Sequence, residues 1–92
     1  MEKWPIYRDV SFEALFPFRV LEIAGVGCAS ASHWHGCMEI VFIEKGALSV
    51  FIDGESHEAR KDDIVALTPG LIHGFHDPSG DAFIRVFLFG FE

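Results

Sequence analysis

The residues best suited to chemistry are three histidines and one glutamate. His33 and His35 form an H-x-H pair, Glu39 follows four residues later, and His73 lies much further along the chain. Imidazole binds zinc, copper, iron and nickel well, and two or three histidines with one carboxylate form a recognised open metal site. The sequence therefore predicts a metal site made by His33, His35, Glu39 and His73. The expected cofactor is a divalent transition metal: zinc, nickel, iron or manganese.

This site places a demand on the backbone. His33 and His35 point to the same face of a β-strand because side chains alternate, whereas Trp34 points the other way, into a core layer. On one straight strand Glu39 would lie roughly 13 Å beyond His35. The two residues share a metal only if the chain bends between them. Gly36 makes that bend easy, since glycine tolerates backbone angles that other residues avoid.

A second interpretation of the same four residues needs no metal. Buried polar groups require partners, so the histidines and Glu39 would also form a hydrogen-bonded floor for a hydroxylated ligand. Nearby, Cys37 is either a thiolate ligand or, the preferred interpretation, a small buried residue. His76 follows soon after His73 and is expected either to face the same pocket as an acid or base, or to end a strand in solvent. His57 lies in a polar segment and is expected to be exposed.

Length and composition limit the class of protein. The chain has 92 residues, half of them apolar and ten of them phenylalanine, which indicates one globular domain with a modest core. A net charge of -7 argues against binding of nucleic acid or of an anionic membrane surface. No signal peptide or membrane span is visible. Two cysteines make no disulfide scaffold, so a reducing cytoplasm is the expected location.

Strand patterns and turn signals alternate along most of the chain. Asp53-Gly54 is a strong hairpin signal because a type I′ turn needs positive φ at both central residues. Pro69-Gly70 marks another turn. Eight strands are predicted, at residues 18–24, 29–35, 39–44, 48–53, 55–60, 64–67, 71–76 and 82–91. Many short strands with no helix longer than a turn predict an all-β fold, an antiparallel sandwich or barrel.

The two ends of the chain each allow more than one interpretation. Residues 1–17 are expected to form an arm, and 18–92 the single domain. The aromatic residues of the arm either plug one end of the domain or form a lid, in which Trp4, Tyr7 and Arg8 close over a ligand. The last predicted strand is apolar on both faces, which makes an uncovered edge a liability. It therefore lies centrally in a sheet, pairs with another subunit, or is followed by further natural sequence.

The spacing of the histidines resembles the first motif of the cupin superfamily. Gly27, His33, His35, Glu39 and Gly46 fall on that motif without a gap. The second motif is degraded: Gly70 and His73 match, whereas Asp62 replaces its first glycine, Thr68 its proline and Asp77 its asparagine. The resemblance implies a small antiparallel double-stranded β-helix, the cupin jelly-roll barrel. Inside such a barrel the two motifs face one another, with a bend before the glutamate.

Within the cupins, the runs HWH, EIVFIEKG, FIDG and DIVALTPGLIH are most similar to the N-terminal sensor domain of AraC-type transcriptional regulators. The resemblance implies an effector-binding barrel for a small polar ligand, often a sugar, whose binding shifts a conformational or oligomeric equilibrium. It also implies a homodimer, and DNA contact only through a helix-turn-helix half that is not in this sequence.

The alternative function is a stand-alone metal-dependent cupin enzyme, a dioxygenase or isomerase. There the metal would act as a Lewis acid or redox centre on a substrate. An intact ligand set favours this alternative, whereas the absence of an evident general base other than His76 or Tyr7 disfavours it. The sensor interpretation is therefore preferred.

Overall fold

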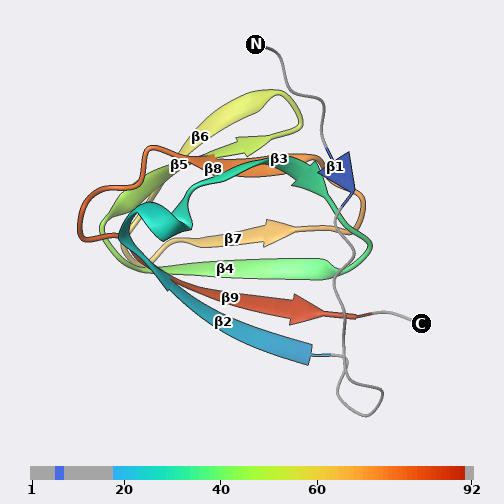
Figure 1. Cartoon of the computed structure of the whole chain (residues 1–92), viewed down its shortest axis with the longest axis horizontal. Helices are drawn as coiled ribbons and strands as arrows, with labels where there is room; N and C mark the ends of the chain where they lie inside the picture. Colours follow the sequence, from blue (N-terminus) through green and yellow to red (C-terminus); the bar gives the residue numbers. More distant parts are fainter. Residues whose placement is uncertain (1–5, 8–17, 91–92) are drawn as a thin grey trace.

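A computed structural model describes residues 6–7 and 18–90, with side chains described from Phe18 onward. Within these ranges nine strands and one short 3₁₀ helix follow one another (Figure 1). They are β1 (Ile6–Tyr7), β2 (Phe18–Ala24), η1 (Gly25–Cys28), β3 (Ser30–Trp34), β4 (Met38–Lys45), β5 (Ala47–Ile52), β6 (Glu55–Arg60), β7 (Ile64–Leu67), β8 (His73–His76) and β9 (Phe83–Phe89). The predicted all-β fold is confirmed.

The strands form two sheets that face each other (Figure 1). One sheet has the order β1-β3-β8-β5-β6 and the other the order β2-β9-β4-β7. All pairings are antiparallel except that of β1 with β3. Alternate residues of both sheets point into the shared core, as the period of two in a strand requires. The fully buried apolar side chains include Val41, Ile43, Leu48, Leu67 and Ile84.

Each of the eight predicted strands has a counterpart, but two features were not expected. Ile6–Tyr7 forms the short strand β1 inside the segment that was predicted as an arm. The 3₁₀ helix Gly25–Cys28 follows β2, where the sequence indicated only the end of a strand. The strand predicted at 71–76 starts later, at His73, because the Leu71 N–H donates to the Thr68 carbonyl 3.2 Å away and closes a turn.

Both predicted turns have the backbone geometry that their sequences favour. Asp53 and Gly54 adopt positive φ values of 50° and 91°, and Ile52 pairs with Glu55 across the turn. This is the two-residue hairpin expected for Asp-Gly. Gly70, with a φ of 81°, closes the turn after Pro69. Both predictions are confirmed.

The phenylalanine-rich last strand lies in the middle of its sheet. β9 pairs with β2 on one side and with β4 on the other, which confirms the central placement among the three alternatives. Ile84, Val86 and Leu88 point into the core and are buried, whereas Phe87 and Phe89 are half-buried on the outer face. A central position leaves this apolar strand no exposed edge.

The prediction that Trp34 lies in the core is wrong. Trp34 is 37% exposed, at the end of β3. The expected alternation holds, because His33 is buried and its neighbour points the other way. The face of the sheet opposite the histidines is the outer face of the barrel. Trp34 therefore lies on the outside, where a second core layer had been predicted.

Gly46, which fits the first cupin motif, joins β4 to β5 in a conformation that disfavours other residues. Its φ is 72°, and a Cβ there would lie 2.9 Å from the Ala82 Cα. We expect Gly46→Ala to lower the free energy of unfolding by about 2–4 kcal/mol, because a left-handed backbone and a backbone contact both oppose the methyl group. The matched control is Gly70→Ala, with a φ of 81° and no atom within 4 Å of the new Cβ.

Urea denaturation of the two variants checks this prediction. Gly70→Ala is expected to lower the free energy of unfolding by about 1–2 kcal/mol, because it has the cost of the left-handed backbone without that of a close contact. Equal losses in the two variants would show that the close approach of Gly46 to Ala82 has no energetic consequence.

Candidate metal centre and ligand pocket

The predicted ligands come from both sheets and meet between them. His33 on β3 and His73 on β8 are direct partners across the five-stranded sheet. Glu39 lies on β4 of the four-stranded sheet, and His35 lies in the connection between β3 and β4. The chain bends at Gly36 and Cys37, so the bend that a shared site requires is confirmed.

All four side chains are withdrawn from solvent. Their exposed fractions are 8% for His33, 3% for His35, 5% for Glu39 and 0% for His73. The three histidines offer nitrogens that lie within 4.8 Å of one another. The centroids of the His33 and His73 rings are 4.5 Å apart, and those of His35 and His73 are 5.0 Å apart. Three imidazoles this close and this buried form a compact donor set.

Backbone carbonyls fix the orientation of all three rings. Nδ1–H of His33 donates to Ala31 at 2.7 Å and that of His73 to Leu71 at 2.9 Å, and Nδ1 of His35 lies 3.2 Å from the Cys37 carbonyl. A carbonyl oxygen only accepts, so Nδ1 of His33 and Nδ1 of His73 carry the proton. Nε2 is therefore the coordinating atom of His33 and His73, and His35 Nε2, which faces Glu39, would coordinate once a metal displaces its proton. Hydrogen bonds of this kind are the usual second shell that orients metal-binding histidines.

Glu39 joins the cluster through a single oxygen. Its Oε1 lies 2.8 Å from His35 Nε2, which donates to it, and 3.4 Å from His73 Nε2. Burial alone would raise the pKa of Glu39, but the hydrogen bond from His35 and the interactions with His73 outweigh burial and lower the pKa to about 2. Glu39 is therefore a carboxylate at neutral pH, the form that binds a metal.

One atom in the cluster is particular evidence for a bound metal ion. His73 Nε2 is buried and, although it is 3.4 Å from the Glu39 oxygen, it has no hydrogen-bond partner among the described residues. Leaving a buried polar atom unpaired costs about 1–3 kcal/mol, so such atoms call for an explanation. A metal ion bound to the three Nε2 atoms and to Glu39 would supply the missing partner. The residues therefore fit a transition metal.

The metal-free cluster makes acid stability depend on Glu39. A carboxylate whose pKa is lowered on folding stabilises the protein above its unfolded pKa, and this contribution is lost as pH falls toward the folded pKa. For Glu39 the window runs from a pKa of 4.5 down to about 2. We expect the wild type to lose up to about 3 kcal/mol more than Glu39→Gln across this window, at about 1.4 kcal/mol per pKa unit.

Urea unfolding of metal-free protein at pH 2 to 5 measures this difference. Parallel stability curves for the wild type and Glu39→Gln would contradict the coupling of Glu39 to the histidines.

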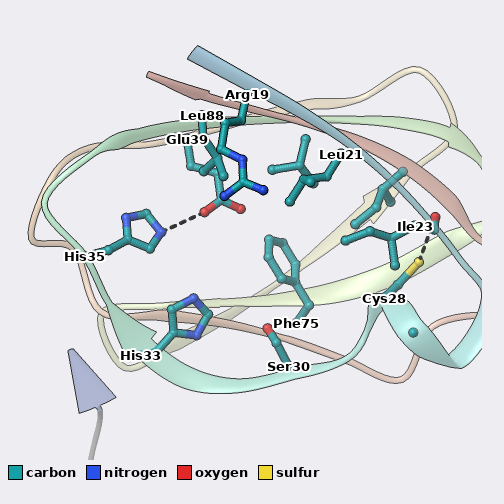
Figure 2. Close-up of a pocket in the computed structure, with 13 residues that line it drawn as sticks. Arg19, Leu21, Ile23, Cys28, Ser30, His33, His35, Glu39, Phe75 and Leu88 are labelled. Atoms are coloured by element: carbon teal, nitrogen blue, oxygen red, sulfur yellow. Dashed lines mark hydrogen bonds and ion pairs between the residues drawn. The ribbon is translucent and has the colours of Figure 1, made fainter. Parts of the chain in front are cut away.

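A pocket of about 430 Å³ opens directly beside three of the four candidate metal ligands (Figure 2). His33, His35 and Glu39 line one end of it, and Arg19 points into it from β2. The rest of the wall is mostly apolar. It is made by Leu21, Ile23, Gly27, Cys28, Ser30, Phe75, Ile84, Val86 and Leu88. An apolar cavity with a few convergent polar groups is the usual form of a small-molecule site.

Arg19 was missed in the sequence analysis. In β2 the residues that face the pocket alternate as Arg19, Leu21 and Ile23. A lone charge on the inward face of an otherwise apolar strand was the available signal. Cys28 was also passed over, although it is buried at the far end of the pocket and its thiol donates to the Ile23 carbonyl at 3.4 Å.

The other predicted site residues have mixed outcomes. His76 is exposed at the end of β8 and its ring packs edge-on against Phe51. Of its two interpretations, the solvent-facing end of a strand is confirmed and the pocket-facing acid or base is wrong. An odd number of steps separates His76 from His73 on β8, and strand alternation puts them on opposite faces. Trp4 and Arg8 lie outside the described residues, and only the backbone of Tyr7 is described, next to Trp34. Their contacts to a ligand stay a prediction.

Two other residues follow the interpretations preferred for them. Cys37 is buried, and its sulfur lies 3.3 Å from His35 Nδ1, the nitrogen turned away from Glu39. Burial and the charge of Glu39 raise the pKa of the Cys37 thiol, which opposes a thiolate ligand. His57 is exposed on β6, as expected.

With this geometry, the chain belongs to the cupin family. The Cupin domain family Cupin_2 matches residues 19–88. No curated protein matches the sequence significantly. Among the described residues, no helix is long and apolar enough to span a membrane.

Solved structures similar to this chain share the same fold. KdgF from Halomonas sp. is 17% identical with a TM-score of 0.71, over 84% of this chain and 73% of that one. An RmlC-like cupin from Shewanella frigidimarina is 22% identical with a TM-score of 0.68, over 83% and 69%. The Cupin_2 domain of an XRE family transcriptional regulator from Enterobacter cloacae is 20% identical with a TM-score of 0.68, over 87% and 88%. At these identities the likeness establishes the fold.

Proposed function

We propose that this domain binds a divalent transition metal through His33, His35, Glu39 and His73, and senses a small molecule in the adjoining pocket. The observation that carries the proposal is the buried histidine cluster at one end of a cavity of about 430 Å³. A metal bound there would act as a Lewis acid or ligand anchor, and zinc, nickel, iron and manganese are all candidates. The free, buried thiols of Cys28 and Cys37 favour action in the reducing cytoplasm.

We prefer a sensor of a transcription regulator to an enzyme. Apart from the proposed ligands, Arg19 and Cys28, the described pocket lining offers no side chain that would exchange a proton near neutral pH. A binding role needs no such group, whereas most metal-dependent enzymes use a general acid or base. The motif runs point to the AraC type, and the regulator named above is of the XRE family. We therefore propose a regulator of the AraC type, and this choice of regulator class rests on the motif runs alone.

The alternative, a metal-dependent cupin oxygenase or isomerase, is favoured by one specific observation. Because His33, His35 and Glu39 themselves line the pocket, a bound molecule would lie next to the proposed metal. Direct contact between metal and substrate is what Lewis-acid chemistry requires. His76 is not the base of such an enzyme, since it lies outside the pocket.

We also propose that a second copy of the chain covers the outer face of the four-stranded sheet. The strand register aligns Val20, Phe87, Ile40 and Ala66 in one row across this face. At the edges of the face Phe18, Val20 and Ile64 are 44%, 46% and 68% exposed. This apolar part of the face, bordered by the ion pairs of Arg85 with Glu22 and Glu44, is typical of a protein interface. Multi-angle light scattering should give the mass of a dimer, and Ile64→Glu with Val20→Glu should give a monomer.

Ligand screening with the metal-loaded chain separates sensor from enzyme. A sensor is expected to raise its melting temperature with particular small molecules and to return them chemically unchanged after hours of incubation, as seen by NMR. Stoichiometric or catalytic conversion of a hit, or uptake of dioxygen, would replace the sensor proposal with the enzyme. The His33→Ala, His35→Ala, His73→Ala triple variant is the control for both readouts.

A further inference from the structure

The register of the four-stranded sheet places a cation and an anion in one row at the pocket. Arg19 on β2 pairs with Leu88 on β9, and Leu88 pairs in turn with Glu39 on β4. All three residues line the pocket, and the guanidinium of Arg19 points into it (Figure 2). The backbones of Arg19 and Glu39 are therefore separated by two strand spacings, a distance of roughly 10 Å across the sheet. A long side chain from that position reaches the same end of the pocket as the metal cluster.

With a metal ion bound, this end of the pocket is positively charged, whereas the chain as a whole is negatively charged. The chain as a whole carries -7. With neutral imidazoles, the charges of Arg19 and Glu39 cancel, and a bound divalent ion leaves a local charge of about +2. An anion is therefore repelled by the protein at large and attracted at this one place. The planar guanidinium pairs with a carboxylate through two parallel hydrogen bonds.

The remainder of the cavity suits an apolar body. Leu21 and Ile23 continue inward along β2 from Arg19, and Phe75 lies opposite them (Figure 2). Cys28, which is 2% exposed and already donates to the Ile23 carbonyl, marks the far end. A volume of about 430 Å³ is in the lower part of the range for small-molecule sites, roughly 300–1,000 Å³. The pocket thus has one charged end and one apolar end.

We propose that the ligand of this pocket is a small organic acid, with its carboxylate held by Arg19 beside the metal and its apolar body against Leu21, Ile23 and Phe75. This proposal rests on the proposed metal site, because the metal supplies most of the positive charge. Arg19 acts as the residue that selects an acid over a neutral or cationic molecule of the same shape.

Calorimetric titration of the full chain, loaded with zinc, tests the proposal with three matched probes. These are 3-phenylpropionate, 3-phenylpropanol and 3-phenylpropylamine, which share an aromatic body and differ in the charge of the head. The acid is expected to bind at least about tenfold tighter than the alcohol and the amine. Arg19→Gln is expected to weaken acid binding about 10–100-fold, as loss of a charged hydrogen bond does, with zinc content unchanged.

Two further variants keep the result specific. Arg60→Gln removes the same charge from an exposed position on β6 and is expected to change acid affinity less than twofold. Arg19→Lys keeps the charge but not the paired hydrogen bonds, so it should restore part of the affinity. Circular dichroism confirms that each variant is folded.

Three outcomes would overturn the proposal: equal binding of acid and alcohol, no binding of the acid at millimolar concentration, or acid binding unchanged in Arg19→Gln. With zinc still bound, each of these would leave the metal site of the proposed function standing. Failure of the wild type to bind zinc would instead overturn the metal site and the metal's part in holding the acid.

Discussion

Zinc is expected to raise the melting temperature of the metal-free chain by about 15–30 °C when its free concentration is a thousand times its dissociation constant. Binding to the folded state alone at that ratio contributes about 4 kcal/mol, and each kcal/mol shifts the melting temperature of a domain of this size by about 4–8 °C. We expect zinc to bind the folded state and not the unfolded chain, because His33 and His73 become neighbours only when β3 pairs with β8.

Differential scanning calorimetry with and without EDTA measures this shift. The His33→Ala, His35→Ala, His73→Ala triple variant should show no shift at the same zinc concentration. A shift of less than about 3 °C in the wild type, or an equal shift in the triple variant, would contradict a metal site built from these residues.

The substitution His73→Leu is expected to weaken metal binding strongly and to leave the stability of the metal-free chain almost unchanged. His73 is fully buried, and its Nε2 lacks a hydrogen-bond partner among the described residues. Leucine of similar volume removes that unpaired atom, although it also removes the hydrogen bond to Leu71. The two effects nearly offset, so the free energy of unfolding without metal should stay within about 1 kcal/mol of the wild type.

Zinc affinity should nevertheless fall at least about 100-fold in His73→Leu, since even loss of a residue that only orients a ligand costs 10–100-fold. Competition with a chromogenic chelator gives the affinity, and urea unfolding gives the stability. His57→Leu, on the exposed strand β6, is the matched control and should change zinc affinity by less than twofold. A large loss of metal-free stability in His73→Leu would mean that His73 is mainly a structural residue.

Much of the fold could be predicted because it rests on local signals. Alternation in the strands and the Asp53-Gly54 and Pro69-Gly70 turns each depend on a few adjacent residues. The bend at Gly36 followed from strand geometry once His35 and Glu39 were assigned to one site. Even the departures from the second motif are tolerated locally. Asp62 and Asp77 hold φ values of 75° and 51°, a region that aspartate enters more readily than most residues.

The errors concern relations that a local pattern does not contain. Strand alternation predicts that Trp34 and His33 point to opposite faces of the sheet. It does not predict which of the two faces is covered by the second sheet. His76 is a different case, since it lies an odd number of residues from His73 and local alternation by itself already favours the solvent-facing alternative. Arg19 reaches the site only through its register with Leu88 and Glu39, and strand pairing between residues far apart in sequence is not visible in the sequence of either strand.

The most direct test of the metal site is elemental analysis of the purified chain beside the His33→Ala, His35→Ala, His73→Ala variant. The geometry predicts close to one transition-metal ion per wild-type chain and none in the variant. Absence of bound metal from the wild type, even after loading with zinc, nickel and iron, would contradict it. The histidines and Glu39 would then be the hydrogen-bonded floor of a pocket that binds its ligand without a metal.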